Sequence, residues 1–115
     1  MSGGQLDWAR EERGGARVLS PKGRVDEATA SAFAERLTNE AASAAGPLVI
    51  DLAGIEYMSS RGLRALTLAQ RKGTESGTTI ALARPNEVMR EILAISRYDM
   101  VFRVSDTIEG ALGGD

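Results

Sequence analysis

The sequence predicts a single α/β domain with a mixed, mostly parallel sheet. Two short strand patterns open the chain, and the Gly14-Gly15 pair between them is typical of a hairpin turn. Helical and strand patterns then alternate to the end of the chain, which is the order expected of an α/β fold. The length of 115 residues suits one domain. We therefore expect four to five strands packed against about four helices.

The opening hairpin is predicted over residues 5–12 and 16–19, with its turn at Arg13-Gly14-Gly15. Pro21 and Gly23 follow closely. Proline lacks the N–H that a strand donates, and glycine weakens a strand. These two residues therefore suit an edge or the end of the second strand.

An amphipathic helix is predicted over residues 27–45, ended by Gly46 and Pro47. Its apolar positions share one helical face: Ala30, Phe33, Ala34, Leu37, Ala41 and Ala44. Residues 48–52 then form a short apolar run, which is typical of a central strand covered on both faces. Asp51 interrupts this run near its carboxyl end.

A second helix is predicted to open at two serines, Ser59 and Ser60, and to run to about Arg71, before the polar residues 72–77. The remaining predicted elements are a strand at 78–83, a helix begun by Asn86, a strand at 100–104, and a terminal helix at 106–112 with Ser105 or Asp106 as its cap.

The two serines at the start of the second helix have two interpretations. Serine is a preferred N-cap, because its hydroxyl accepts a backbone N–H left unpaired in the first turn. One serine suffices for that role, so the second hydroxyl indicates a phosphorylation site. A phosphate would be favoured there by the helix dipole and by Arg61 and Arg64. From the chemistry of the residues alone, capping is the stronger interpretation.

The same stretch resembles the STAS domain of bacterial anti-sigma factor antagonists. The matching positions are Asp51-Leu52, Tyr57-Met58, Ser60, Gly62 and Leu63, in the order and spacing of the family pattern. The resemblance covers roughly residues 16–112, so we expect residues 1–115 to form a single STAS domain.

The resemblance implies that Ser60 is the serine phosphorylated by a cognate anti-sigma kinase. Ser59 stands where the family usually has Asp, which makes it a second, less favoured acceptor, and Arg61 replaces a serine or threonine. The surroundings implied for the phosphate or partner are Asp26, Asp51, Ser59, Arg61, Gly62 and Arg64. For Asp26, a helix-start carboxylate is the alternative and is favoured as its main role.

Composition excludes several other functions. The chain has no cysteine and no histidine, which removes disulfides, thiolate nucleophiles, imidazole bases and the usual zinc sites. No Gly-x-Ser-x-Gly or P-loop pattern is present, so we expect neither an enzyme nor a bound cofactor or metal. A net charge of −2 favours neither nucleic acid nor an anionic membrane. With no signal peptide and no membrane-length apolar run, we expect a cytoplasmic protein.

The resemblance implies a function by partner switching. The unmodified protein would bind an anti-sigma factor and free its sigma factor, the anti-sigma serine kinase would phosphorylate Ser60, and a phosphatase would reverse the modification. The alternative is a STAS interaction module that works without phosphorylation, such as a scaffold in a sensory complex or a binder of a small anion or nucleotide. Arg61, in place of a hydroxyl, keeps this alternative open.

Overall fold

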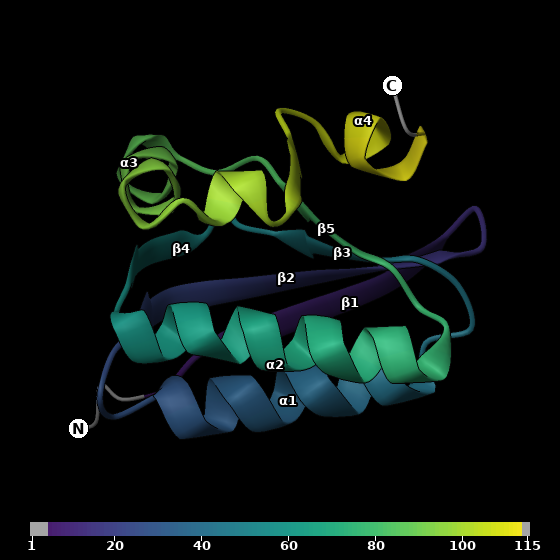
Figure 1. Cartoon of the computed structure of the whole chain (residues 1–115), viewed down its shortest axis with the longest axis horizontal. Helices are drawn as coiled ribbons and strands as arrows, with labels where there is room; N and C mark the ends of the chain where they lie inside the picture. The colour runs from purple at the N-terminus through teal and green to yellow at the C-terminus, as the bar shows by residue number, and fades with distance from the viewer. Residues whose placement is uncertain (1–4, 114–115) are drawn as a thin grey trace.

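The structure is a computed structural model that describes residues 5–113. One sheet lies between two groups of helices (Figure 1). Its strands follow the order β1-β2-β3-β5-β6, and β4 pairs with the far end of β2. The strands are β1 (Asp7–Arg13), β2 (Ala16–Val25), β3 (Leu48–Asp51), β4 (Ile55–Met58), β5 (Ile80–Ala83) and β6 (Arg103–Ser105). The helices are α1 (Ala30–Ser43), α2 (Ser60–Ser76), α3 (Glu87–Ser96) and α4 (Ile108–Gly113).

The predicted α/β architecture is confirmed. Only β1 and β2 pair antiparallel among the described strands, and the other ladders are parallel. The sheet has six strands instead of the expected four to five, because residues 55–58, for which no strand was predicted, form β4. Four α-helices pack on it within the described residues, as expected, with a short 3₁₀ turn at Tyr98–Met100.

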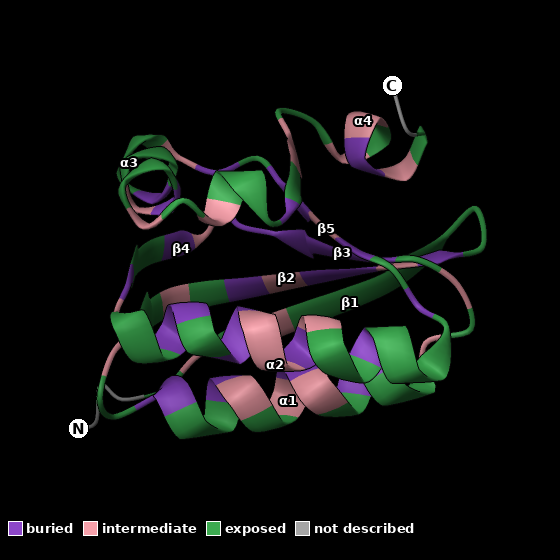
Figure 2. Ribbon diagram, viewed as in Figure 1, coloured by how far each residue is buried: buried purple, intermediate pink, exposed green. Residues whose placement is uncertain are grey.

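The two faces of the sheet carry different layers. Helices α1 and α2 cover one face, and α4 lies on the other (Figure 1). Alternation along β3 explains this: Leu48 and Ile50 belong to the large core with α1 and α2, whereas Val49 belongs to a smaller core with Ala111 of α4. Both sides of β3 are therefore buried, and the buried residues concentrate between the layers (Figure 2). This accounts for the continuous apolar run in its sequence.

Strand β2 continues through Pro21 and Gly23, where the sequence suggested a break. Its first half pairs with β3 at residues 17–19 and its second half with β4 at residues 23–25. Pro21 lies between these two parallel ladders, so its missing N–H breaks neither of them. Gly23 has φ +129° beside a register shift, a conformation that glycine adopts readily. The long strand β2 can thus pair with both β3 and β4 along one edge.

Helix α2 is longer than predicted because it passes through Gly73 and ends at Gly77. Gly77 has φ +80°, the left-handed conformation common after a helix. Gly73 is buried within the helix, where a Cβ atom would lie only 2.8 Å from the Thr78 carbonyl oxygen. Its role is therefore close packing, and not termination.

Several other boundaries differ from the predictions. The first strand spans Asp7–Arg13 and not residues 5–12, and the strand predicted at 78–83 begins at Ile80. Helix α1 begins at Ala30 and not at residue 27, because the preceding residues form a turn closed by the Asp26 carbonyl. The 3₁₀ turn shortens the last strand to β6. Helix α4 is capped by Thr107, whose hydroxyl accepts the Gly110 N–H at 2.9 Å, so neither Ser105 nor Asp106 has that role.

Candidate functional site

The candidate site lies where β2 and β4 end and α2 begins. Strand β4 runs parallel to the second half of β2, with Arg24 opposite Tyr57 and Val25 opposite Met58. The Ser59 N–H then donates to the Val25 carbonyl at 2.8 Å. This pairing places the first turn of α2 beside the chain that leaves β2 toward α1.

The two serines have different positions at this helix start. Ser59 is the N-cap, with extended backbone angles, and its hydroxyl accepts the Gly62 N–H at 3.3 Å. Ser60 is the first residue of α2 and is exposed. Within residues 5–113, the Ser60 hydroxyl makes no hydrogen bond. Capping is thus confirmed for Ser59 and leaves the Ser60 hydroxyl available.

Gly62 fixes how closely this turn packs on the sheet. It is buried, and a Cβ atom at this position would overlap the side chains of Met58 and Val25. A larger residue would force the start of α2 away from both strands. The position of Ser60 therefore depends on a glycine two residues later.

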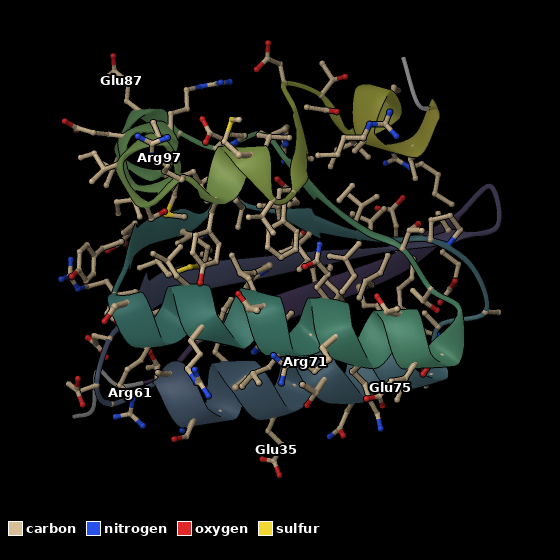
Figure 3. The ribbon with its side chains drawn as sticks, in the orientation of Figure 1. Glu35, Arg61, Arg71, Glu75, Glu87 and Arg97 are labelled. Carbon is tan, nitrogen blue, oxygen red and sulfur yellow. The ribbon has the colours of Figure 1, made fainter. Side chains whose placement is uncertain are left out.

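The two arginines of the first turns are in different situations. Arg61 Nη1 lies 2.8 Å from Glu27 Oε1, in an ion pair whose side chains are 52% and 82% exposed. Such an exposed pair contributes roughly 0–1 kcal/mol. Arg64 is exposed and makes no ion pair within the described residues. Both arginines line a shallow groove of about 180 Å³ between α1 and α2, at the end where Arg61 is seen in Figure 3.

Asp26 lies beside the site, and its contacts are those of a turn. Its carboxylate accepts the Ala28 N–H at 3.0 Å and lies 3.4 Å from the Thr29 hydroxyl. Arg24 is 4.0 Å away. The carboxylate therefore orders the chain before α1, close to the role favoured from the sequence.

Asp51 is not brought to the site. It follows Ile50 on β3 and points toward the α4 side of the sheet, away from α2. Arg84 holds it with two hydrogen bonds, 3.1 Å from Nε to Oδ1 and 2.7 Å from Nη2 to Oδ2. Burial alone would raise the pKa of Asp51, but the hydrogen bonds from Arg84 and the Ala53 N–H outweigh it and lower the pKa. The grouping of Asp51 with the serines is therefore not supported by the structure.

Sequence reasoning missed three residues of this surface. The Arg24 guanidinium lies 4.9 Å from the centroid of the Tyr57 ring, and Tyr57 is 36% exposed. Glu27 holds Arg61. These contacts follow from the pairing of β2 with β4, and no local signal in the sequence indicates that pairing.

The described residues contain neither a candidate metal centre nor a helix that could span a membrane. No group of three or more Asp or Glu side chains there is arranged to hold a metal ion. None of the helices between residues 5 and 113 combines the length and the apolarity needed to cross a membrane.

The family model described as "Mlab, STAS domain" matches residues 8–104, which is most of the chain. The protein belongs to the STAS domain family. The anti-sigma-F factor antagonist RsfB of Mycobacterium tuberculosis, strains CDC 1551 / Oshkosh and H37Rv, is 33% identical over 103 residues. These residues cover 90% of this chain and 84% of that protein.

Solved structures show the same fold. A crystal structure of an anti-sigma factor antagonist from Mycobacterium paratuberculosis matches this STAS domain with a TM-score of 0.85 at 25% identity, covering 98% of this chain and 96% of that one. SpoIIAA of Bacillus, an anti-sigma factor antagonist, matches in its unphosphorylated form with a TM-score of 0.74 at 15% identity, covering 92% and 93%. At that identity the likeness concerns the fold alone.

The different roles of the two serines, with Ser59 as the helix cap and Ser60 exposed, lead to a stability prediction for this STAS domain. Ser59→Ala should lower the free energy of unfolding by about 1 kcal/mol, because the Gly62 N–H loses its capping partner. Ser60→Ala should change it by less than about 0.5 kcal/mol, because an exposed side chain is removed. Chemical denaturation of both variants measures the difference. Equal effects of the two substitutions would contradict the assignment of Ser59 as the cap.

Proposed function

We propose that this STAS domain is an anti-sigma factor antagonist whose binding is switched by phosphorylation of Ser60. The unmodified protein binds an anti-sigma factor that is also a serine kinase, and a phosphatase reverses the modification. The protein itself carries no catalysis and acts in the cytoplasm. The observation that supports this most is the exposed Ser60 hydroxyl, left out of the helix cap by its neighbour Ser59.

The chemistry of the site suits a phosphate on Ser60. The kinase transfers the γ-phosphoryl group of ATP to the Ser60 oxygen, which loses its proton, and ADP leaves. The first turn of α2 contains no acidic residue, so the positive end of the helix dipole is not offset there. A phosphoserine brings about −1.5 to −2 charges to this position. The site can therefore hold the phosphate without rearranging the fold.

Arg64 is the better partner for that phosphate. Side chains four residues apart lie on the same face of a helix, and Ser60 and Arg64 have this spacing. Adjacent residues do not face each other in this way, and Arg61 is already paired with Glu27. Arg61 therefore contributes positive charge near the site, while Arg64 contacts the phosphate.

The switch acts by changing a contact surface. Tyr57, Ser60 and Arg61 are exposed at neighbouring positions on β4 and α2 and form the proposed binding surface for the anti-sigma factor. A charge of −1.5 to −2 placed there is costly to desolvate under a partner, and it repels acidic groups. Binding is lost although the domain stays folded.

The relatives support the antagonist function. RsfB, at 33% identity, and the Mycobacterium paratuberculosis protein, at 25%, are both described as anti-sigma factor antagonists. Both alignments cover at least 90% of this chain, so they include the β4–α2 site.

Mass spectrometry of the phosphorylated site tests the proposal. The protein is incubated with ATP and the candidate anti-sigma kinases of its host, alongside Ser59→Ala and Ser60→Ala variants. We expect one phosphate, mapped to Ser60 and lost only in Ser60→Ala, because of the two serines at the start of α2 Ser60 is the one that is exposed and free of the cap. Phosphate on Ser59, or on neither serine with any kinase that binds the protein, would contradict the proposal.

The role of Arg64 predicts a change in stability. Phosphorylation of Ser60 should stabilise the domain by roughly 0.5–2 kcal/mol, through the helix dipole and the Arg64 pair. Arg64→Gln should lose part of this gain, whereas Arg71→Gln, an exposed arginine farther along α2, should retain it (Figure 3). Denaturation of phosphorylated and unmodified forms measures the gain. Equal gains in both variants would exclude Arg64 as the partner.

A second candidate function is an interaction module that works without phosphorylation, such as a scaffold that binds a small anion or nucleotide. Arg61 supports it, because this permanently charged side chain, here paired with Glu27, occupies the position where the family usually has a hydroxyl that could be phosphorylated. Thermal stabilisation by a nucleotide or inorganic phosphate, without phosphoryl transfer, would favour this function.

A further inference from the structure

The α4 side of the sheet contains a polar cavity that the proposed switch does not use. Its volume is about 460 Å³, within the range of small-molecule sites. It lies at the carboxyl ends of β3 and β5, the end of parallel strands at which α/β proteins commonly bind ligands. Its charged and polar lining consists mainly of Glu11, Arg13, Ser20, Asp51, Arg84 and Glu109. The sheet separates this cavity from α1 and α2.

Arg84 is held in the cavity wall by two constraints. Asp51, only 5% exposed, accepts hydrogen bonds from Nε and Nη2 of Arg84. The Ser20 hydroxyl donates to the same carboxylate at 3.3 Å. Arg84 also has φ +54°, a left-handed conformation that is strained for a residue with a side chain. Such strain persists where the surroundings fix the residue. The chain thus maintains a defined guanidinium orientation at this point.

The same arginine has a group left for a ligand. Asp51 uses one edge of the guanidinium, and Nη1 makes no hydrogen bond within residues 5–113. The side chain is 50% exposed. A carboxylate bound on one edge is a common way to fix an arginine that binds a second anion through its other donors. The free edge therefore suits one carboxylate of a ligand.

The cavity lining also provides hydrogen-bond acceptors. Glu109 lies 3.4 Å from Arg13 through one oxygen, and Glu11 holds the same arginine at 2.9 Å. Each glutamate is more than half exposed and has a second oxygen free of these pairs. Glu109 is also near enough to Arg84 to help Asp51 raise the pKa of that guanidinium. The cavity lining thus combines two carboxylate acceptors with the free donor edge of Arg84.

The charged side chains that line the cavity indicate which class of ligand it can bind. Three carboxylates, of Glu11, Asp51 and Glu109, face two guanidinium groups, of Arg13 and Arg84. This excess of negative charge disfavours a phosphate dianion, and the fixed Arg84 disfavours a simple cation. A molecule with one negative and one positive end can pair with the free edge of Arg84 and with the glutamates of the lining.

We propose that this cavity binds a small zwitterion of the amino-acid type. Its carboxylate pairs with the free edge of Arg84, and its ammonium group pairs with Glu109 and Glu11. Ser20 and Thr107 line the space between these ends. The site is independent of Ser60, because it opens on the other side of the sheet.

NMR titration of the full-length ¹⁵N-labelled protein tests this inference. The probes are glycine, β-alanine, 4-aminobutyrate and 6-aminohexanoate, which differ in the distance between their charged ends. We expect at least one to bind with a Kd of about 1 mM or tighter, shifting the amide signals of Ser20, Asp51 and Thr107 and the Arg84 side-chain N–H signal. Butyrate and butylamine, which carry one charged end each, should bind at least about tenfold more weakly than 4-aminobutyrate or the best probe.

Variants at the cavity mouth complete the test without disturbing the core. Glu109→Gln, at an exposed position, should weaken binding by about tenfold, while Glu35→Gln on the outer face of α1 should not change it (Figure 3). The double variant Asp51→Asn/Arg84→Gln removes the buried carboxylate and its half-exposed partner together, so that neither charge is left unpaired, and it should abolish binding. The inference is overturned if no probe gives saturable shifts at these residues, if the single-charge probes bind as tightly, or if Glu109→Gln behaves like Glu35→Gln.

Discussion

The close packing of the first turn of α2 against β2 and β4 determines the shape of the proposed binding surface of this domain. Gly62 allows it, because any side chain there would overlap Val25 and Met58. The Ser59 N–H bonded to the Val25 carbonyl fixes the entry of the chain, and the Ser59 hydroxyl completes the cap. With the cap already made, Ser60 is left exposed at a helix N-terminus, where an added phosphate is electrostatically favoured.

The sheet separates two groups of charged residues with different roles. On the α1–α2 side, the arginines near Ser60 are exposed, and the Arg61–Glu27 pair is weak enough to be exchanged when a charge or partner arrives. On the α4 side, the buried Asp51 accepts two hydrogen bonds from the half-exposed Arg84, and leaving this buried carboxylate unpaired would be costly. The proposed phosphorylation surface and the polar cavity therefore lie on opposite sides of the sheet and share no residue.

Local signals in the sequence predicted most of the fold. Helical periodicity, the hairpin glycines and the Asn86 cap were sufficient for the order of all the α-helices and of every strand except β4. Strand β4 was missed, because its four residues are stabilised by pairing with β2, a contact between distant parts of the chain. The position of Asp51 was missed for a related reason. Side chains alternate along β3, so the sequence shows that Asp51 and Ile50 lie on opposite faces of the strand. Because β3 is buried on both faces, the sequence does not show which of these faces α2 covers. The prediction of Ser60 as the phosphorylated residue, in contrast, rests on a local motif, and the structure shows that this serine is exposed at the start of α2.

The affinity of one anti-sigma factor for three forms of this protein tests the central claim most directly. The forms are the unmodified protein, the protein phosphorylated at Ser60, and Ser60→Asp, each checked by circular dichroism for an unchanged fold. We predict tight binding of the unmodified form and at least about tenfold weaker binding of the other two, which corresponds to about 1.4 kcal/mol. Equal affinity of the phosphorylated and unmodified forms would show that Ser60 is not the switch.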